Sequence, residues 1–204
     1  IEGFVNLKLE KTRDGKEFFV PYYAGPIRSA GGTEAGFSLL VIDHLREIFG
    51  FAKYDPTEDE VKRGVHESYM YHERVTNLQY LPSEEEIDFL MKYVPVQVSG
   101  DASEDKEVFN YKDLKRIPTN FIRSGFCLVF NEGLAQKAPK ILKRLKKLRT
   151  QGFKLSDWNF LEDFVKLQQK IKENKKVGSG ASATYIKDLV AGRPVFGHPS
   201  RSGS

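Results

Sequence analysis

The sequence lacks the features that mark several large classes of protein. It has a single cysteine, Cys127, so it can form no internal disulfide framework and no cysteine-based zinc finger. Its longest uncharged apolar run, residues 35–42, is far shorter than the roughly 20 residues that cross a membrane, and no basic, apolar leader opens the chain. We therefore expect a cytoplasmic chain with no membrane partner. The start without Met and the Ser-Gly-Ser end indicate a piece of a longer protein.

Motifs of nucleotide-binding and metal enzymes are also missing. The glycines fit neither the Walker A spacing nor the three-glycine dinucleotide pattern, and no two are spaced as the Gly-x-x-Gly loop of a KH domain. The four histidines show no paired ligand spacing. The acidic runs 58–60 and 84–86 open helices, where negative charge favours the helix dipole. We expect no catalytic residue, no metal site and no cofactor in this chain.

The charges are unevenly distributed along an otherwise ordinary globular composition. Of the 204 residues, 40% are hydrophobic and 29% charged, which is enough for one substantial core or two small ones. Residues 1–136 hold 16 Lys and Arg against 23 Asp and Glu, whereas residues 137–176 hold 13 against 4. A basic block beside an acidic body is typical of contact with a polyanion or an acidic partner, but a solvated helix face explains it equally well.

Periodicity and turn residues predict interleaved strands and helices in the first half. Apolar and polar residues alternate over 5–10, and Asp14-Gly15 supplies the turn of a hairpin that returns over 17–23. Apolar residues at helical spacing indicate a helix over 33–48, which Gly50 ends. The other elements expected here are helices at 57–64 and 83–93, both opened by capping boxes, and strands at 65–76 and 95–99.

The second half is predicted to be mostly helical. Residues 119–130 resemble a strand that is buried on one face. Asn131 can cap a basic helix that extends to 149, in which Pro139 either introduces a kink or resets the start. Ser156 can cap a last long helix to about residue 172, and a short helix is expected at 185–191.

Two groups of residues are candidates for binding an anion. Residues 25–33 place glycines, an arginine and hydroxyls before a helix N-terminus, where free N–H groups and the helix dipole can hold a phosphate. The alternative is a tight glycine turn between a strand and a helix. The phosphate-loop candidates are Gly25, Arg28, Ser29, Gly31, Gly32 and Thr33. The candidates for nucleic-acid contact are Arg28, Arg116, Arg123, Lys137, Lys140, Arg193, His198 and Arg201, together with the other basic residues of the 137–149 helix.

Five segments, taken in order along the chain, resemble the large subunit of the archaeal family-D DNA polymerases. They are YYAGPIRSAGGT at 22–33, LQYLPSEEE at 78–86, IPTNFIRSG at 117–125, EGLAQKA at 132–138 and AGRPVFGHPSR at 191–201. The resemblance covers nearly the whole chain. It implies DNA replication by a heterodimer, in which the large subunit extends primed DNA with deoxynucleoside triphosphates and magnesium, and a small subunit supplies proofreading nuclease activity.

The resemblance also implies a catalytic centre of double-psi β-barrels, whose metal-binding aspartates lie in an Asn-Ala-Asp-Phe-Asp-Gly-Asp stretch. That stretch is absent here. We therefore expect a non-catalytic part of the large subunit that binds or positions primer–template DNA. The alternative is a scaffold that packs on the catalytic barrels or on the small subunit without touching DNA.

The fold class expected on these grounds is α+β. It comprises a mixed α/β module of KH-like character without a Gly-x-x-Gly loop, followed by basic and amphipathic helices. The expected organisation is an α/β region with the hairpin and glycine-loop helix at 1–116, a strand with two long basic helices at 117–176, a flexible linker at 177–183, and a segment leading to the missing catalytic core at 184–204.

Overall fold

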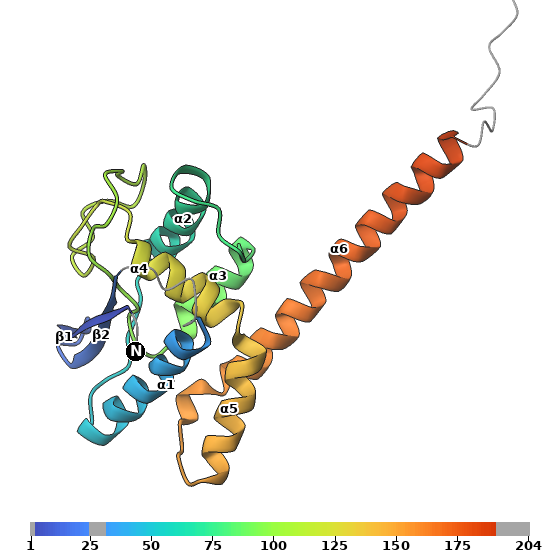
Figure 1. Ribbon diagram of the computed structural model, residues 1–204. Helices are drawn as coiled ribbons and strands as arrows, with labels where there is room; N and C mark the ends of the chain where they lie inside the picture. The colour runs from blue at the N-terminus through green and yellow to red at the C-terminus, as the bar shows by residue number, and fades with distance from the viewer. Residues whose placement is uncertain (1–2, 25–31, 191–204) are drawn as a thin grey trace, which may run out of the picture. The chain divides into compact units, whose positions relative to one another are not determined.

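The computed structural model describes residues 3–24 and 32–190, and it confirms the α+β class (Figure 1). The chain divides into two units, Ile1–Val165 and Lys166–Ser204, so the first unit spans the boundary predicted at 116/117. The KH-like character is not confirmed. The elements in order are β1 (Phe4–Lys11), β2 (Glu17–Tyr23), α1 (Gly32–Phe49), α2 (Glu58–Arg74), α3 (Glu84–Tyr93), α4 (Ser124–Cys127), the π-helix η1 (Leu128–Ala135), α5 (Ala138–Thr150), the 3₁₀ turn η2 (Ser156–Trp158) and α6 (Phe160–Val190).

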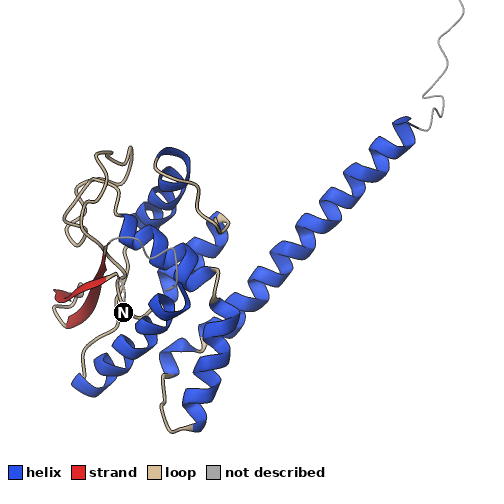
Figure 2. Ribbon diagram, viewed as in Figure 1, coloured by secondary structure: helices blue, strands red, loops and turns tan. Residues whose placement is uncertain are grey.

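The predicted hairpin is confirmed, and it forms the one sheet among the described residues (Figure 2). β1 and β2 pair in antiparallel fashion, and Gly15 in the turn has the positive φ of 83° that a glycine adopts without strain. The segment predicted as a strand at 95–99 runs beside β2, because Ser99 donates its N–H to Pro21 and Tyr23 donates to Ser99. It forms only an isolated bridge there, between Ser99 and Tyr22.

The predicted helices at 33–48 and 83–93 are confirmed as α1 and α3, and both predicted capping boxes are present. The Thr57 side chain accepts from the N–H of Glu60 while the Glu60 carboxylate accepts from the N–H of Thr57, and Ser83 and Glu86 do the same. α1 packs between β2 and η1, where Leu39 and Leu40 are fully buried. These contacts fix one side of α1 against β2 and η1.

The predicted strand at 65–76 is wrong, because α2 continues through it to Arg74. Gly64 does not end the helix. It makes room for α3, since a Cβ there would lie 2.7 Å from the Met91 sulfur. The buried side of α2 includes Gly64, Glu67, Ser68 and Tyr71, at the spacing of one helical face. Because that face is mostly polar or glycine, a search for apolar helical periodicity passes over it.

The predicted strand at 119–130 is also wrong, since α4 and η1 occupy residues 124–135. Every residue from 122 to 135 is buried, so no alternation between core and solvent distinguishes a strand from a helix there. Figure 1 shows this segment running between α1 and α2, with which it is in contact. α5 then begins at Ala138 with Pro139 in its first turn, which confirms that the proline resets the helix start.

The last helix differs from the prediction at both of its ends. Residues Ser156–Trp158 form a single 3₁₀ turn, and α6 begins at Phe160. The backbone of α6 is helical as far as Val190, through the flexible linker predicted at 177–183. A search of the described residues finds no helix with the length and apolar character that crossing a membrane requires.

Candidate nucleic-acid interface

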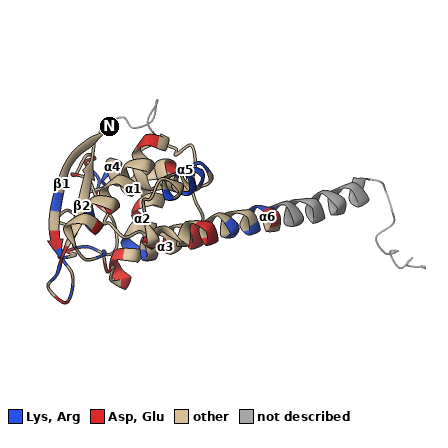
Figure 3. Cartoon of the chain, turned by 90° about the horizontal axis from the view of Figure 1, so that it is seen from below, with Lys and Arg blue, Asp and Glu red and all other residues tan. Residues whose placement is uncertain are grey.

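α5 is an amphipathic helix with a buried apolar side and an exposed basic side. Ala138, Ile141 and Leu145 are fully buried, and α5 contacts α1 and η1. Lys140, Lys143 and Lys147 recur at three- and four-residue spacing on the opposite side and are exposed. Lys137, which precedes the helix and is half-buried, continues this row. We call these four residues the α5 lysine face, and Figure 3 shows the concentration of basic residues on α5.

The other cations of α5 are bonded within the protein. Arg144 pairs with Glu34 at 2.8 Å, and Lys146 pairs with Glu162 at 3.0 Å. Arg149 donates to the backbone oxygen of Leu155 at 2.8 Å and to the Asn159 side chain at 2.7 Å. Among the described residues, the four members of the α5 lysine face have no ion-pair partner.

Lys137 lies beside the first turn of α1. A Cβ on Gly32 would be 3.6 Å from the Lys137 side-chain carbon next to the ammonium group, and 3.5 Å from the backbone oxygen of Glu132. The structure therefore brings Lys137 next to Gly32, at the end of the predicted phosphate loop, and Thr33 follows Gly32 in the first turn of α1. The remaining predicted residues lie outside the described part of the chain: Gly25, Arg28, Ser29, Gly31, Arg193, His198 and Arg201.

Arg123 is a structural residue in the interior, with 1% of its surface exposed. Its guanidinium bonds the Glu67 carboxylate at 2.8 Å and donates to the Ser99 hydroxyl at 3.2 Å, and Arg63 donates to the same carboxylate at 3.0 Å. Burial by itself would raise the pKa of Glu67, but the charges and hydrogen bonds of the two arginines outweigh it and lower the pKa. The prediction that Arg123 contacts phosphate is inconsistent with this burial.

Arg116 is buried in a similar way. It donates to Glu60 at 2.8 Å and to the backbone oxygen of Asp55 at 2.8 Å, and it forms an ion pair with the Asp55 carboxylate. Burial opposes its charge, but the hydrogen bonds to Glu60 and Asp55 raise its pKa overall. Because Glu60 and Asp55 accept four hydrogen bonds from this buried guanidinium, the predicted phosphate contact at Arg116 is inconsistent with the structure as well.

Glycines in the family-like segments bring backbones into close contact. A Cβ on Gly125 would overlap the backbone oxygen of Tyr23, and one on Gly133 would lie 3.1 Å from that of Gly32. The N–H of Gln79 donates to the Glu132 carboxylate at 2.6 Å. Four of the five segments therefore meet around β2, α1 and η1. Sequence analysis missed this convergence, because spacing along the chain does not report which segments are neighbours in space.

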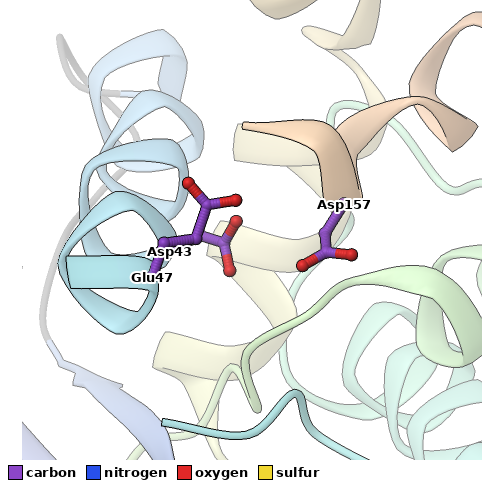
Figure 4. A group of neighbouring side chains, drawn as sticks. All are labelled: Asp43, Glu47 and Asp157. Carbon is purple, nitrogen blue, oxygen red and sulfur yellow. The ribbon is translucent and has the colours of Figure 1, made fainter. Parts of the chain in front are cut away.

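One group of carboxylates has the proximity of a metal site, and Figure 4 shows Asp43, Glu47 and Asp157 facing one another. The oxygens of Asp43 and Asp157 are already bonded. Arg46 donates to Asp43 and to Asp157, both at 2.6 Å, and the Trp158 ring N–H donates to the second oxygen of Asp43 at 3.1 Å. Lys53 also bonds Asp157, and His44 lies 3.9 Å from Glu47. The Arg46 guanidinium takes the place of a cation, and the cluster fastens α1 to η2.

Comparison with known proteins identifies the family. Residues 1–167 match the family model described as the N-terminal part of the DNA polymerase II large subunit DP2. The whole chain is 46% identical to the DNA polymerase II large subunit of Methanosarcina barkeri, 43% identical to that of Picrophilus torridus and 40% identical to that of Nanoarchaeum equitans, over 18%, 18% and 19% of their lengths. The chain thus spans less than a fifth of these relatives. It belongs to the family of archaeal DNA polymerase II large subunits and corresponds to their N-terminal part.

Proposed function

We propose that this chain is a non-catalytic part of a replicative DNA polymerase and positions primer–template DNA by its phosphate backbone. The observation that carries the proposal is the α5 lysine face. Lys140, Lys143, Lys147 and the preceding Lys137 have no ion-pair partner in the described part of the chain, and the other side of α5 is fixed in the core. Like charges one helical turn apart repel each other, and an aligned polyanion relieves that repulsion.

The predicted contacts outside the described residues remain part of the proposal. Lys137 lies beside Gly32, which directly follows the sequence segment that contains Arg28. In the proposal, a DNA phosphate is bound both by the lysine charge and by hydrogen bonds from backbone N–H groups of residues 25–33. Arg193, His198 and Arg201 remain proposed contacts of the same kind.

For the whole protein, we propose the activity that the resemblance implies. The large subunit would extend primed DNA in the cytoplasm with deoxynucleoside triphosphates and magnesium held by domains outside this chain. A small proofreading subunit would be its partner. Within the described residues the one carboxylate cluster is occupied by Arg46, which supports a non-catalytic role for this part.

The test is DNA binding by the complete polymerase that contains this chain. The variant Lys140→Gln/Lys143→Gln/Lys147→Gln removes three charges from the α5 lysine face, and Lys11→Gln/Lys16→Gln/Lys112→Gln removes three exposed charges elsewhere. We expect the first variant to bind primer–template at least tenfold more weakly at low salt. Each lost phosphate contact reduces the number of counterions that binding releases, and this release drives the association. The second should bind normally. The proposal would be contradicted if the unmodified polymerase and both variants bound DNA equally, or if both variants lost the same amount of DNA affinity.

The second candidate function is a scaffold that packs on the catalytic barrels or the small subunit. Residues in or beside the family-like segments point inward, which favours this role: Arg123 and Arg116 bond carboxylates, and the glycines of these segments allow neighbouring backbones to approach closely. A scaffold role predicts that the lysine variant binds DNA normally.

A further inference from the structure

α1 is apolar on two sides, of which only one is used in the first unit. Leu39, Leu40 and Ile42 are at most 5% exposed. On the other side Val41, Leu45, Ile48 and Phe49 recur at i, i+4, i+7 and i+8, and they are 44%, 37%, 63% and 64% exposed. A helix that is apolar all round is normally buried all round. The solvent-facing row is therefore not the surface expected of a helix at the edge of a finished domain.

The apolar row continues onto the hairpin. The Phe49 ring lies 6.5 Å from the Phe19 ring in an edge-on arrangement, and Phe19 is paired across the hairpin with Leu9. Paired residues point to the same face of a sheet, so Leu9 lies on the side of Phe49, and it is 45% exposed. We call Val41, Leu45, Ile48, Phe49 and Leu9 the α1 apolar face. Contiguous exposed apolar patches of this kind mark interaction sites.

This face is held in a fixed conformation. Arg46 bonds Asp43 in α1 and Asp157 in η2, and the Ser38 and Tyr23 hydroxyls are 2.6 Å apart, which joins α1 to β2. Gly50 ends the helix directly after Phe49 with a positive φ of 71°. A partner would meet a preformed surface, so binding would require little ordering of α1.

We infer that the α1 apolar face is where an apolar segment from the rest of the same large-subunit polypeptide docks. The chain covers only 18–19% of its relatives, so more than four fifths of such a polypeptide lies outside it. Segments of one polypeptide meet at a high effective concentration. Permanent interfaces resemble a core cut in half, as this face does, whereas a DNA-binding surface is basic. The inference goes beyond DNA positioning and does not depend on it.

Photo-crosslinking in the complete polymerase tests the inference. Ile48 is replaced by p-benzoylphenylalanine, the protein is irradiated, and crosslinked peptides are mapped by mass spectrometry. We expect a crosslink to a residue of the same polypeptide beyond the region covered by this chain. A crosslink only to a second copy, only to another subunit, or to nothing would overturn the inference. The control is the same replacement at Phe109, which is 57% exposed and packs beside α2 on Arg74 and His66. It should not reach the segment found from position 48.

A second measurement, which uses no photo-crosslinker, tests the inference in case p-benzoylphenylalanine at position 48 disturbs the packing. The variant Ile48→Glu/Phe49→Glu is compared with Phe109→Glu by hydrogen exchange in the complete polymerase. We expect amides of the crosslinked segment to exchange about tenfold faster or more in the first variant and to be unchanged in the second, because charge on the face opens the contact locally. Unchanged exchange in both would overturn the inference. DNA binding by the α5 lysine face should persist in both variants, so failure here leaves the proposed function standing.

Discussion

Two sets of cationic side chains in the first unit have opposite environments. Arg46, Arg63, Arg116 and Arg123 are at most 8% exposed, and each bonds at least one carboxylate. Lys140, Lys143 and Lys147 are exposed, with no ion-pair partner among the described residues. The planar guanidinium fork matches a carboxylate in a dry interior, whereas an ammonium group on a flexible stem is easily solvated. The comparison indicates that the arginines hold this unit together and that the α5 lysines are available to bind a partner.

Removing a carboxylate from the buried set should have the largest effect on stability. Glu67→Gln leaves Arg63 and Arg123 in the interior without their counter-charge. We expect a loss of about 3–5 kcal/mol in the free energy of unfolding, measured by urea denaturation. The control is Glu34→Gln, which breaks the exposed pair with Arg144 and should change the free energy by less than about 1 kcal/mol. If both variants lost similar amounts of unfolding free energy, burial would not determine how much these ion pairs contribute to stability.

Gly125→Ala should have the next largest effect on stability, because the added methyl group would push the segment that carries Arg123 away from β2. A methyl group there would overlap the Tyr23 backbone oxygen, so the backbone would have to shift. We expect a loss of about 3 kcal/mol by the same denaturation measurement. Gly32→Ala is the matched variant, since its Cβ would meet neighbours at ordinary contact distances of 3.5 and 3.6 Å. A tolerated Gly125→Ala would refute the close approach.

The ion pair between Asp55 and Arg116 should make stability depend on pH. Burial opposes ionisation of Asp55, but hydrogen bonds from Arg116 and Arg13 lower its pKa to about 2. A lowered folded-state pKa contributes stability above the unfolded pKa of about 3.9, and that stability disappears as the pH falls through about 2. We expect Asp55→Asn to cost about 2 kcal/mol at pH 7 and almost nothing near pH 2. A difference independent of pH would contradict the assignment.

The smallest effect on stability is expected at the α5 lysine face. Lys140→Gln, Lys143→Gln and Lys147→Gln should each change the free energy of unfolding by less than about 0.5 kcal/mol, because none of these side chains has an ion-pair partner among the described residues. Thermal denaturation of the three variants checks this. A larger loss would show that the lysines contribute to packing and would remove the contrast with the arginines.

Local signals predicted the elements whose patterns are complete within a few residues. The Asp14-Gly15 turn and the two capping boxes are examples, because their partners lie within three or four positions. The prediction of a strand at 119–130 is wrong, since burial on all sides over 122–135 erases the period that separates strand from helix. The helix predicted at 57–64 is shorter than α2, because the buried side of α2 carries the polar residues Glu67 and Ser68. Glu67 is stabilised there by Arg123, which is 56 positions away in the sequence.

The candidate site was predictable in part for the same reason. The basic composition of α5 is visible in the sequence, and it led to Lys137 and Lys140. Which cations are already paired is not visible, because Arg144 is paired with Glu34, 110 positions away. Arg123 occurs in a family-like segment and Arg116 directly precedes that segment, yet the carboxylates that bond them come from α2 and from the loop before it. Only tertiary structure separates arginines that brace the fold from lysines that face outward.

The most direct measurement is the salt dependence of DNA binding as the α5 lysines are removed one after another. The complete polymerase, with Lys140→Gln, then Lys143→Gln and then Lys147→Gln added, is titrated against labelled primer–template over a series of salt concentrations. Each lysine that neutralises a phosphate contributes about −0.9 to the slope of log K against log salt on duplex DNA. If α5 lies along the DNA, the slope becomes shallower by about that amount at each step. An unchanged slope through all three steps would show that the lysine face does not contact DNA.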